Sequence, residues 1–335
     1  MFDPACCPYR SCPFHLQPGA RFFIRHGFYH PQCRNHPVPR FRCRFCGRTF
    51  SRQSFRADYR HKKPHLNATF LRLMVSCVGL RQAARALQVA RRTVEHRFRW
   101  LASHAYHYQY QQLRGACLRG RYQLDELESF ESNRYQPVSV PVLIERDTFF
   151  IVATAVAPLR RKGRLSALQR RRLAQYEALH GRRRTLSAKA VRAVLSRLRE
   201  LVAPDGPVRL DSDRNPSYGS TGRALFGKRF RWHRHSATAR RDRSNPLFPI
   251  NHTNARLRHF LARLRRRTWC VSRLRECLQQ HLQIAALWSN FCRGITNRTR
   301  ITPAQQMGVA TRPYRPEEVL GWRQDWDTGM APVAD

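Results

Sequence analysis

The chain has 335 residues, of which 63 are Lys or Arg and 21 are Asp or Glu, so its formal net charge is +42. A hydrophobic share of 42% excludes a wholly disordered protein. No run of about 18 apolar residues occurs, the length that a membrane-spanning helix needs, and the first residues hold no apolar signal core. We therefore expect a cytoplasmic protein with reduced thiols and no membrane partner, whose charge attracts nucleic acid through counterion release.

Two short cysteine pairs lie near the start of the chain, Cys7 with Cys12 and Cys43 with Cys46. Two pairs on separate turns are typical of a tetrahedral, all-thiolate zinc site. We predict a structural Zn²⁺ in a zinc ribbon that spans residues 1–55. Other residues could replace one of these ligands, and this alternative stays open for Cys6, Cys33, His15, His30 and His36.

The apolar pattern of residues 60–110 predicts a helix-turn-helix module. The expected elements are helices over residues 66–75, 80–87 and 91–101, with a break at Gly79 and a turn at residues 88–90. Ala84 and Val94 should pack the last two helices together. The last helix should face a DNA major groove with Arg91, Arg92, Glu95 and Arg97. The alternative is an ordinary helical hairpin with a solvated basic face.

Strand-like runs dominate from about residue 118. They cover residues 121–125, 138–144, 148–156, 208–210 and 229–232. Basic helical stretches cover residues 159–203, with a break at Gly181, and residues 250–298, with a break near 269–272. This order predicts an α/β domain over residues 118–300 with an RNase H-like mixed sheet and flanking helices. We interpret residues 159–203 as a helical insertion and residues 301–335 as a C-terminal tail.

Two scarce acids, Asp125 and Asp213, each close a strand-like run. In an RNase H-like fold, acids at these places converge and hold two Mg²⁺ ions through their oxygens, so we predict a site for Mg²⁺ or Mn²⁺. Asp211 competes with Asp213, because it lies two residues upstream on the same strand face. The alternative is that both are ordinary turn acids.

The order of these features resembles a DDE-type transposase of a small bacterial insertion sequence. The resemblance rests on the cysteine pairs, the helix-turn-helix pattern, Leu124-Asp-Glu-Leu-Glu-Ser-Phe130 and Ser212-Asp-Arg-Asn-Pro-Ser-Tyr218. Later motifs similar to that family are Ile250-Asn-His-Thr-Asn-Ala-Arg-Leu-Arg258, Trp288-Ser-Asn290 and Thr302-Pro-Ala304. It covers residues 7–323, and it implies that Asp125 and Asp213 are the first two catalytic acids.

The third acid of that family has no counterpart here, because no Asp or Glu lies between Asp242 and Glu276. In the family this acid precedes a basic residue by seven positions, and counting back from Arg258 gives Asn251, with Asn254 as the alternative. An amide oxygen can ligate a hard cation, but it brings no charge and cannot act as a base. Arginines along this helix should contact phosphates, namely Arg256, Arg258, Arg263 and Arg265.

The resemblance implies a metal-dependent transposase that binds the terminal repeats of its element and target DNA, both double-stranded. It would act as a homo-oligomer on paired ends, and it would be associated with the bacterial nucleoid. Two alternatives stay open. One is a non-catalytic DNA-binding protein derived from a transposase. The other is a nuclease of the same fold that only hydrolyses DNA.

Overall fold

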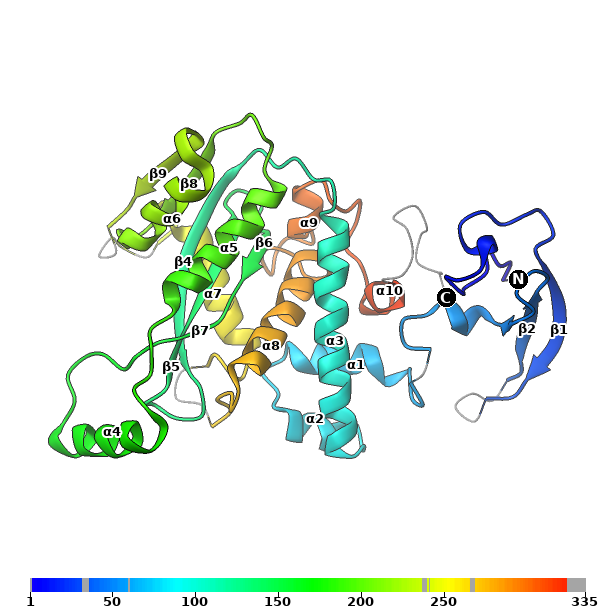
Figure 1. Cartoon of the computed structure of the whole chain (residues 1–335), viewed down its shortest axis with the longest axis horizontal. Helices are drawn as coiled ribbons and strands as arrows, with labels where there is room; N and C mark the ends of the chain where they lie inside the picture. The colour runs from blue at the N-terminus through cyan, green and yellow to red at the C-terminus, as the bar shows by residue number, and fades with distance from the viewer. Residues whose placement is uncertain are drawn as a thin grey trace. The chain divides into compact units, whose positions relative to one another are not determined.

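A computed structural model describes residues 2–31, 36–59, 61–236, 240, 242–265 and 269–323 (Figure 1). Cys33, one of the alternative zinc ligands, lies outside these residues. The chain divides into two compact units, one made of residues 1–69 and 315–335 and the other of residues 70–314.

The smaller unit holds a three-stranded antiparallel sheet in the order β1-β2-β3. Its elements are η1 (Pro13–His15), β1 (Phe23–Tyr29), β2 (Val38–Cys43), β3 (Thr49–Phe50) and η2 (Arg52–Phe55). Four buried phenylalanines and the cysteines form its core, namely Phe22, Phe41, Phe50 and Phe55 with Cys6, Cys7, Cys12 and Cys43. Such a small core is typical of domains that need an additional constraint such as a metal.

The end of the chain is not a simple tail. Helix α9 (Pro303–Gln306) belongs to the larger unit, whereas α10 (Pro316–Gly321) belongs to the smaller one. The Arg323 guanidinium donates to the carbonyls of Ser54 and, at 3.3 Å, Pro8. The last described residues are therefore tied to the cysteine-containing unit.

Three helices open the larger unit at the expected places: α1 (Leu66–Met74, which starts just before the unit boundary), α2 (Leu80–Ala86) and α3 (Arg91–Gln112). Ala84 and Val94 are buried, as the pattern predicted. Gln88 takes a left-handed φ of 50° in the turn between α2 and α3. Helix α3 is longer than predicted because its second half buries apolar residues and packs on α8 (Arg275–Leu287).

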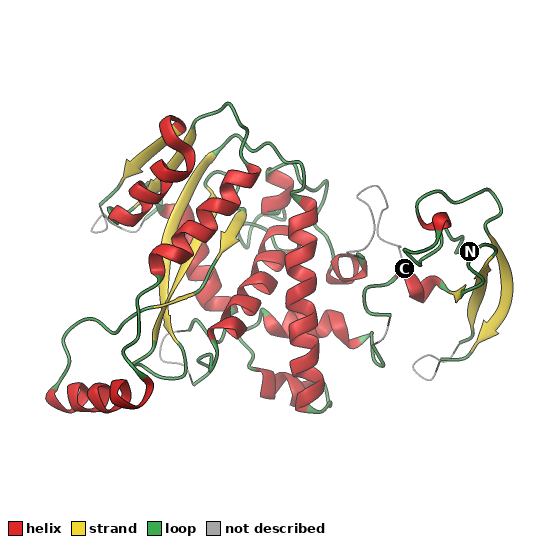
Figure 2. Cartoon of the chain, viewed as in Figure 1, coloured by secondary structure: helices red, strands yellow, loops and turns green. Residues whose placement is uncertain are grey.

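A mixed six-stranded sheet lies at the centre of the larger unit (Figure 2). Its strands are β4 (Arg121–Phe130), β5 (Pro137–Glu145), β6 (Ile151–Thr154), β7 (Ala157–Pro158), β8 (Val208–Ser212) and β9 (Phe230–Arg234). The order is β6-β5-β4-β8-β9, with β7 paired to β5. Strands β4, β8 and β9 are parallel, whereas β5 is antiparallel to both of its neighbours on this path. The predicted mixed sheet with flanking helices is confirmed.

Helices flank the sheet: α5 (Ser187–Leu201), α6 (Pro216–Phe226), α7 (Phe248–Phe260) and α8. Gly219 and Gly222 let α6 lie against β9, because a Cβ at these positions would come within 2.2 Å of Trp232 and 2.1 Å of Phe230. The stretch 250–298 breaks earlier than predicted: α7 ends at Phe260, and a π-helix, η4 (Trp288–Cys292), follows α8.

The predicted insertion at residues 159–203 is two different structures. Helix α5 buries Val191, Leu195 and Leu198 and packs against β5 and β6, so it is part of the domain core. Helix α4 (Ala167–His180) buries no residue. Only α4 and its connections therefore stand apart from the core.

Candidate functional site

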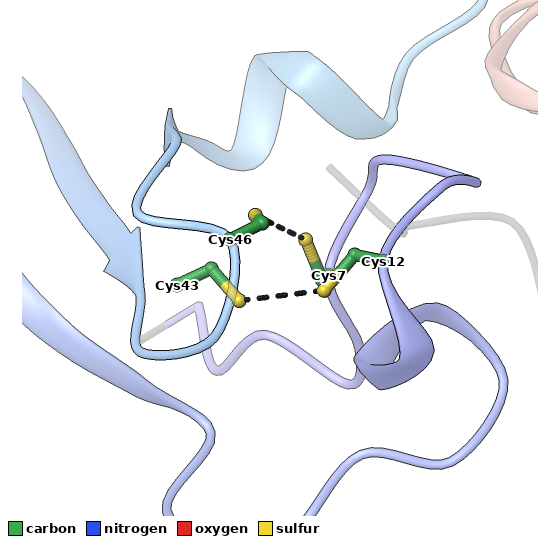
Figure 3. Close-up of side chains that lie close together, drawn as sticks. All are labelled: Cys7, Cys12, Cys43 and Cys46. Atoms are coloured by element: carbon green, nitrogen blue, oxygen red, sulfur yellow. Dashed lines mark hydrogen bonds between the residues drawn. The ribbon is translucent and has the colours of Figure 1, made fainter.

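The four predicted cysteines converge in the smaller unit (Figure 3). The sulfurs of Cys7 and Cys46 are 3.8 Å apart, those of Cys12 and Cys43 are 3.7 Å apart, and all four lie within 4.8 Å of one another. A tetrahedral zinc site with Zn–S bonds of about 2.3 Å requires sulfurs about 3.8 Å apart. The four cysteines can therefore hold a metal such as zinc.

Tight turns aim these thiols at one point. The backbone N–H of Cys12 donates to Tyr9 O at 2.9 Å, and Gly47 N–H donates to Cys43 O at 3.0 Å. Gly47 has a φ of +69°, which glycine adopts without strain. The sequence therefore favours a tight turn at each of the two cysteine pairs.

The alternative ligands lie elsewhere. The His15 ring bonds the carbonyl of Cys7 through Nδ1 at 2.7 Å, and His30 and His36 are exposed. Cys6 belongs to the aromatic core. Among the described residues, Cys7, Cys12, Cys43 and Cys46 form the only group of three or more His, Cys, Asp or Glu with ligand atoms this close.

Burial raises the pKa of the Cys7 and Cys12 thiols in the metal-free protein. The pKa of Cys43 is lowered instead: burial again opposes ionisation, but the backbone N–H groups of Cys46 and Phe45, together with hydrogen bonds to the Cys46 and Cys12 side chains, stabilise the thiolate and outweigh it. A metal must therefore displace protons from buried thiols, so its binding is coupled to pH.

Asp125 and Asp213 come together in the larger unit. Strands β4 and β8 are parallel, with Gln123 opposite Asp211 and Leu124 opposite Ser212. One step further along the same register, Asp213 follows β8 at the level of Asp125. Parallel neighbours lie about 4.8 Å apart and point their side chains to one face. The prediction that Asp125 ends its strand is wrong, since β4 continues to Phe130 and pairs with β5 from Tyr122 to Phe130.

The pKa of Asp125 is raised by burial and, in part, by its proximity to Asp213. Burial is the main cause that raises the pKa of its carboxyl, and the negative charge of Asp213 raises it further. Hydrogen bonds from the Glu126 N–H to Oδ1 and from the Asn254 amide to Oδ2, each 2.8 Å, act in the opposite direction. The two acids are therefore close enough to repel each other.

Asn254, from α7, is the amide that contacts the acid pair. Its Nδ2 donates to Asp125, while its Oδ1 is buried and has no hydrogen-bond partner among the described residues. A buried acceptor without a donor is costly, so it marks a place where a further group fits. Asn251 lies one helical turn earlier on the same helix and is half-buried. The hydrogen bond to Asp125 comes from Asn254, which the sequence offered as the alternative to Asn251 for the third position.

Asp211 has a different environment. Its carboxylate bonds the His235 ring at 3.0 Å and lies 3.6 Å from the Arg121 guanidinium and 3.8 Å from that of Arg146. Its side chain is 1% exposed. Asp211 therefore has its own cations, whereas Asp213 faces another acid.

Sequence reasoning assigned no role to two further groups near the acid pair. Burial raises the pKa of the Tyr218 phenol well above its usual range, and the charges of Glu126, Asp213 and Asp125 raise it further. Glu126 accepts a 2.6 Å hydrogen bond from Ser139. In the sequence, the only signals for these two residues are that Glu126 is adjacent to Asp125 and that Tyr218 ends the motif that contains Asp213.

Some of the basic residues predicted to contact DNA are exposed, whereas others are buried or half-buried. Arg92 and Arg265 are exposed, and Arg91 is exposed while pairing with Glu95 at 2.6 Å. The prediction that Arg97 faces outward is wrong, because it is 5% exposed on the inner side of α3. Arg258 is half-buried and donates to Leu264 O at 3.4 Å.

Two other arginines of this region serve the fold. Arg256 donates to the carbonyls of Ile295 and Gly294 at 3.0 and 3.2 Å. Arg263 donates to Ser272 at 3.1 Å and lies over the Phe98 ring. Because α7 ends at Phe260, Arg263 and Arg265 are not on the same helix as Arg256 and Arg258, contrary to the prediction.

Neither a scan against protein-family models nor a search of curated proteins found a match to this chain. In the described part of the chain, no helix has the length and apolar character needed to cross a membrane.

Proposed function

We propose that this protein is a DDE-type DNA transposase whose larger unit is an RNase H-like catalytic domain. The observation that supports this most directly is the acid pair: Asp125 lies in β4, Asp213 directly follows the parallel neighbour β8, burial and then the charge of Asp213 raise the pKa of Asp125, and Asn254 bonds Asp125. The sheet order β6-β5-β4-β8-β9, with β5 antiparallel, is the order expected of that fold.

The residues of this cluster fit a hard divalent cation. Burial, and then repulsion from Asp213, raise the pKa of Asp125, and a cation bound by both carboxylates would relieve the repulsion. The buried Asn254 Oδ1, which has no hydrogen-bond partner in the described part of the chain, is the type of oxygen that Mg²⁺ or Mn²⁺ accepts as a ligand. When bound, such ions activate a water or a 3′-hydroxyl and stabilise the leaving oxygen of a phosphodiester.

The remaining features support double-stranded DNA as the partner. The net charge of +42 favours a polyanion, and Arg91 and Arg92 stand exposed at the start of α3, the helix proposed to read the terminal repeats. The smaller unit would be a zinc ribbon with Zn²⁺ on the four cysteines. The transposase would act as a homo-oligomer that joins paired ends to target DNA in the bacterial nucleoid.

A non-catalytic DNA-binding protein is the second candidate, and one observation favours it. Helix α7 brings an amide, not an acid, to the acid pair, and the sequence holds no Asp or Glu between Asp242 and Glu276. Such a protein would keep the DNA contacts and lack metal-dependent chemistry.

An assay of strand transfer by the purified protein distinguishes the transposase from the non-catalytic DNA-binding protein. The substrate is DNA that carries the sequences flanking its own coding region, with Mg²⁺ or Mn²⁺. We expect joined products from the unchanged protein and from Asp205→Asn, an exposed acid paired with Arg119, and none from Asp125→Ala. Activity in Asp125→Ala would refute the assignment. DNA binding without products from any form would favour the non-catalytic candidate, and cleaved but unjoined DNA the hydrolytic nuclease.

A further inference from the structure

Residues 159–186 form an arm that carries α4 away from the sheet. Figure 1 shows α4 at the end of two connecting segments, apart from the helices that cover the sheet. We refer to residues 159–186 as the basic arm. No motif assigned above includes it.

The charge of the basic arm is strongly one-sided. It contains ten Lys and Arg residues and a single acid, Glu177. The cations are Arg160, Arg161, Lys162, Arg164, Arg170, Arg171, Arg172, Arg182, Arg183 and Arg184. Adjacent like charges repel, so this density costs folding free energy unless a polyanion is bound.

The fold of α4 does not account for this charge. The helix buries no residue, and Leu168 and Leu179 are 57% and 82% exposed. Its described contacts are a capping box between Ser166 and Gln169, a left-handed Gly181 after its end, the ion pair of Glu177 with Arg160, and a hydrogen bond from the Gln136 amide to the Tyr176 hydroxyl. A helix of this length is marginal by itself in water. The arginines Arg170–Arg172 therefore do not serve a core.

The base of the arm is nevertheless fixed. Leu186 N–H donates to Pro158 O at 2.9 Å, and Arg160 N–H donates to Thr185 Oγ1 at 3.0 Å. Arg183 pairs with Glu131 at 2.6 Å, and Arg160 lies 3.6 Å from Glu177. Two of the ten cations are thus used to hold the arm, which starts after β7 and ends just before the first residue of α5.

We propose that the basic arm binds the phosphates of duplex DNA, independently of sequence, with α4 in a groove and Arg170–Arg172 reaching both backbones. Successive residues turn by about 100° around a helix, so three consecutive arginines point to both sides of it. The major groove of DNA admits an α-helix, and guanidinium groups bind phosphate in a bidentate way. This inference rests on the proposed function only in taking DNA as the partner.

The direct test is the salt dependence of binding of the zinc-loaded protein to a non-specific 30-base-pair duplex without Mg²⁺ or Mn²⁺. The probe variant is Arg170→Ala/Arg171→Ala/Arg172→Ala. The matched control removes three exposed arginines outside the arm, Arg192→Ala/Arg199→Ala/Arg223→Ala. Each lost phosphate contact reduces the slope of log K against log salt by about 0.9, so we expect a reduction of about 2 to 3 in the probe variant. Its binding at low salt should weaken at least about tenfold, and that of the control less than about threefold.

Two further variants address helix folding and chemistry. Arg170→Lys/Arg171→Lys/Arg172→Lys keeps the charge and should retain most of the binding, since phosphate attraction is electrostatic. Arg182 and Arg184 lie outside α4, so Arg182→Ala/Arg184→Ala leaves the residues of that helix unchanged. We expect this variant to weaken binding as well, and a loss of helix structure would not explain that result. Equal binding and slopes for arm and control variants would overturn the proposal.

The outcomes also separate this inference from the proposed function. DNA binding that depends on the arm, without strand transfer, would support the proposal for the basic arm and contradict the proposed transposase activity. If the arm variants changed neither strand transfer nor DNA binding, the proposed transposase activity would be supported and the proposal for the basic arm would be contradicted.

Discussion

The amide of Asn254 donates a 2.8 Å hydrogen bond to Oδ2 of Asp125, from a helix that the sequence places 129 residues downstream. The same amide has a buried oxygen without a hydrogen-bond partner among the described residues. Asn254 therefore satisfies one carboxylate oxygen and leaves an acceptor of its own in the acid cluster.

Asn254→Asp should couple stability to metal. Without divalent ions the change replaces a donor by a third negative charge and should lower the unfolding free energy by about 1.5–3 kcal/mol. With Mg²⁺ or Mn²⁺ the loss should be reversed. The control is Asn251→Asp on the same helix. Thermal unfolding with and without Mn²⁺ decides between them, and a metal effect confined to Asn251→Asp would move the third position to residue 251.

Asp211 and Asp213 should respond in opposite ways to neutralisation. Asp211→Asn leaves Arg121 and Arg146 without their buried counter-charge. These guanidiniums are partly exposed, so we expect a loss of about 1–3 kcal/mol, less than for a fully buried pair. Asp213→Asn removes repulsion from Asp125 and should stabilise the metal-free protein. Denaturant unfolding of the zinc-loaded protein without added Mg²⁺ or Mn²⁺ measures both, and equal losses would contradict the separation of the two acids.

Removal of metal should unfold the smaller unit. Its aromatic core is small and contains three of the four clustered cysteines, and structural zinc contributes about 10 kcal/mol or more to such domains. We expect about one zinc per chain, loss of the unit's structure on chelation, and the same loss in Cys43→Ser. Cys117→Ser, at an exposed cysteine, is the control. Full zinc content in Cys43→Ser would show that the ion is held elsewhere.

Acid should destabilise the larger unit through His281. Its Nε2 bonds Met74 O at 2.7 Å, and burial, reinforced by Arg263, lowers its pKa to about 3. A depressed histidine pKa means that the unfolded state takes up the proton first. Stability is therefore full above about pH 6.5 and falls by up to roughly 1.4 kcal/mol per pH unit below it. His281→Gln should flatten this slope, and exposed His96→Gln should not. An unchanged slope in His281→Gln would assign the effect to other groups.

Local chemistry made part of this structure predictable. The cysteine pairs carry their own turns, as Gly47 shows, and the strand and helix periods located the sheet because most of its buried residues are apolar. Ala84 and Val94 followed from helix spacing alone.

Long-range packing decided what the pattern missed. Helix α3 extends to Gln112 because it packs on α8, and Arg97 is buried although its charge favoured an outward position. Asp125 lies within a strand because β5 pairs with β4 from Tyr122 to Phe130. The partner of Asp125 on α7 depended on how a helix packs on the sheet, which residue spacing alone does not determine.

Mn²⁺ binding by the zinc-loaded protein, followed by the electron paramagnetic resonance of free Mn²⁺, tests the central claim most directly. The claim is that Asp125 and Asp213 together hold a divalent cation. We predict saturable binding in the unchanged protein and in Asp211→Asn, and its loss in Asp125→Asn and in Asp213→Asn. Binding that persists in Asp213→Asn and disappears in Asp211→Asn, or no saturable binding in the unchanged protein, would contradict the account.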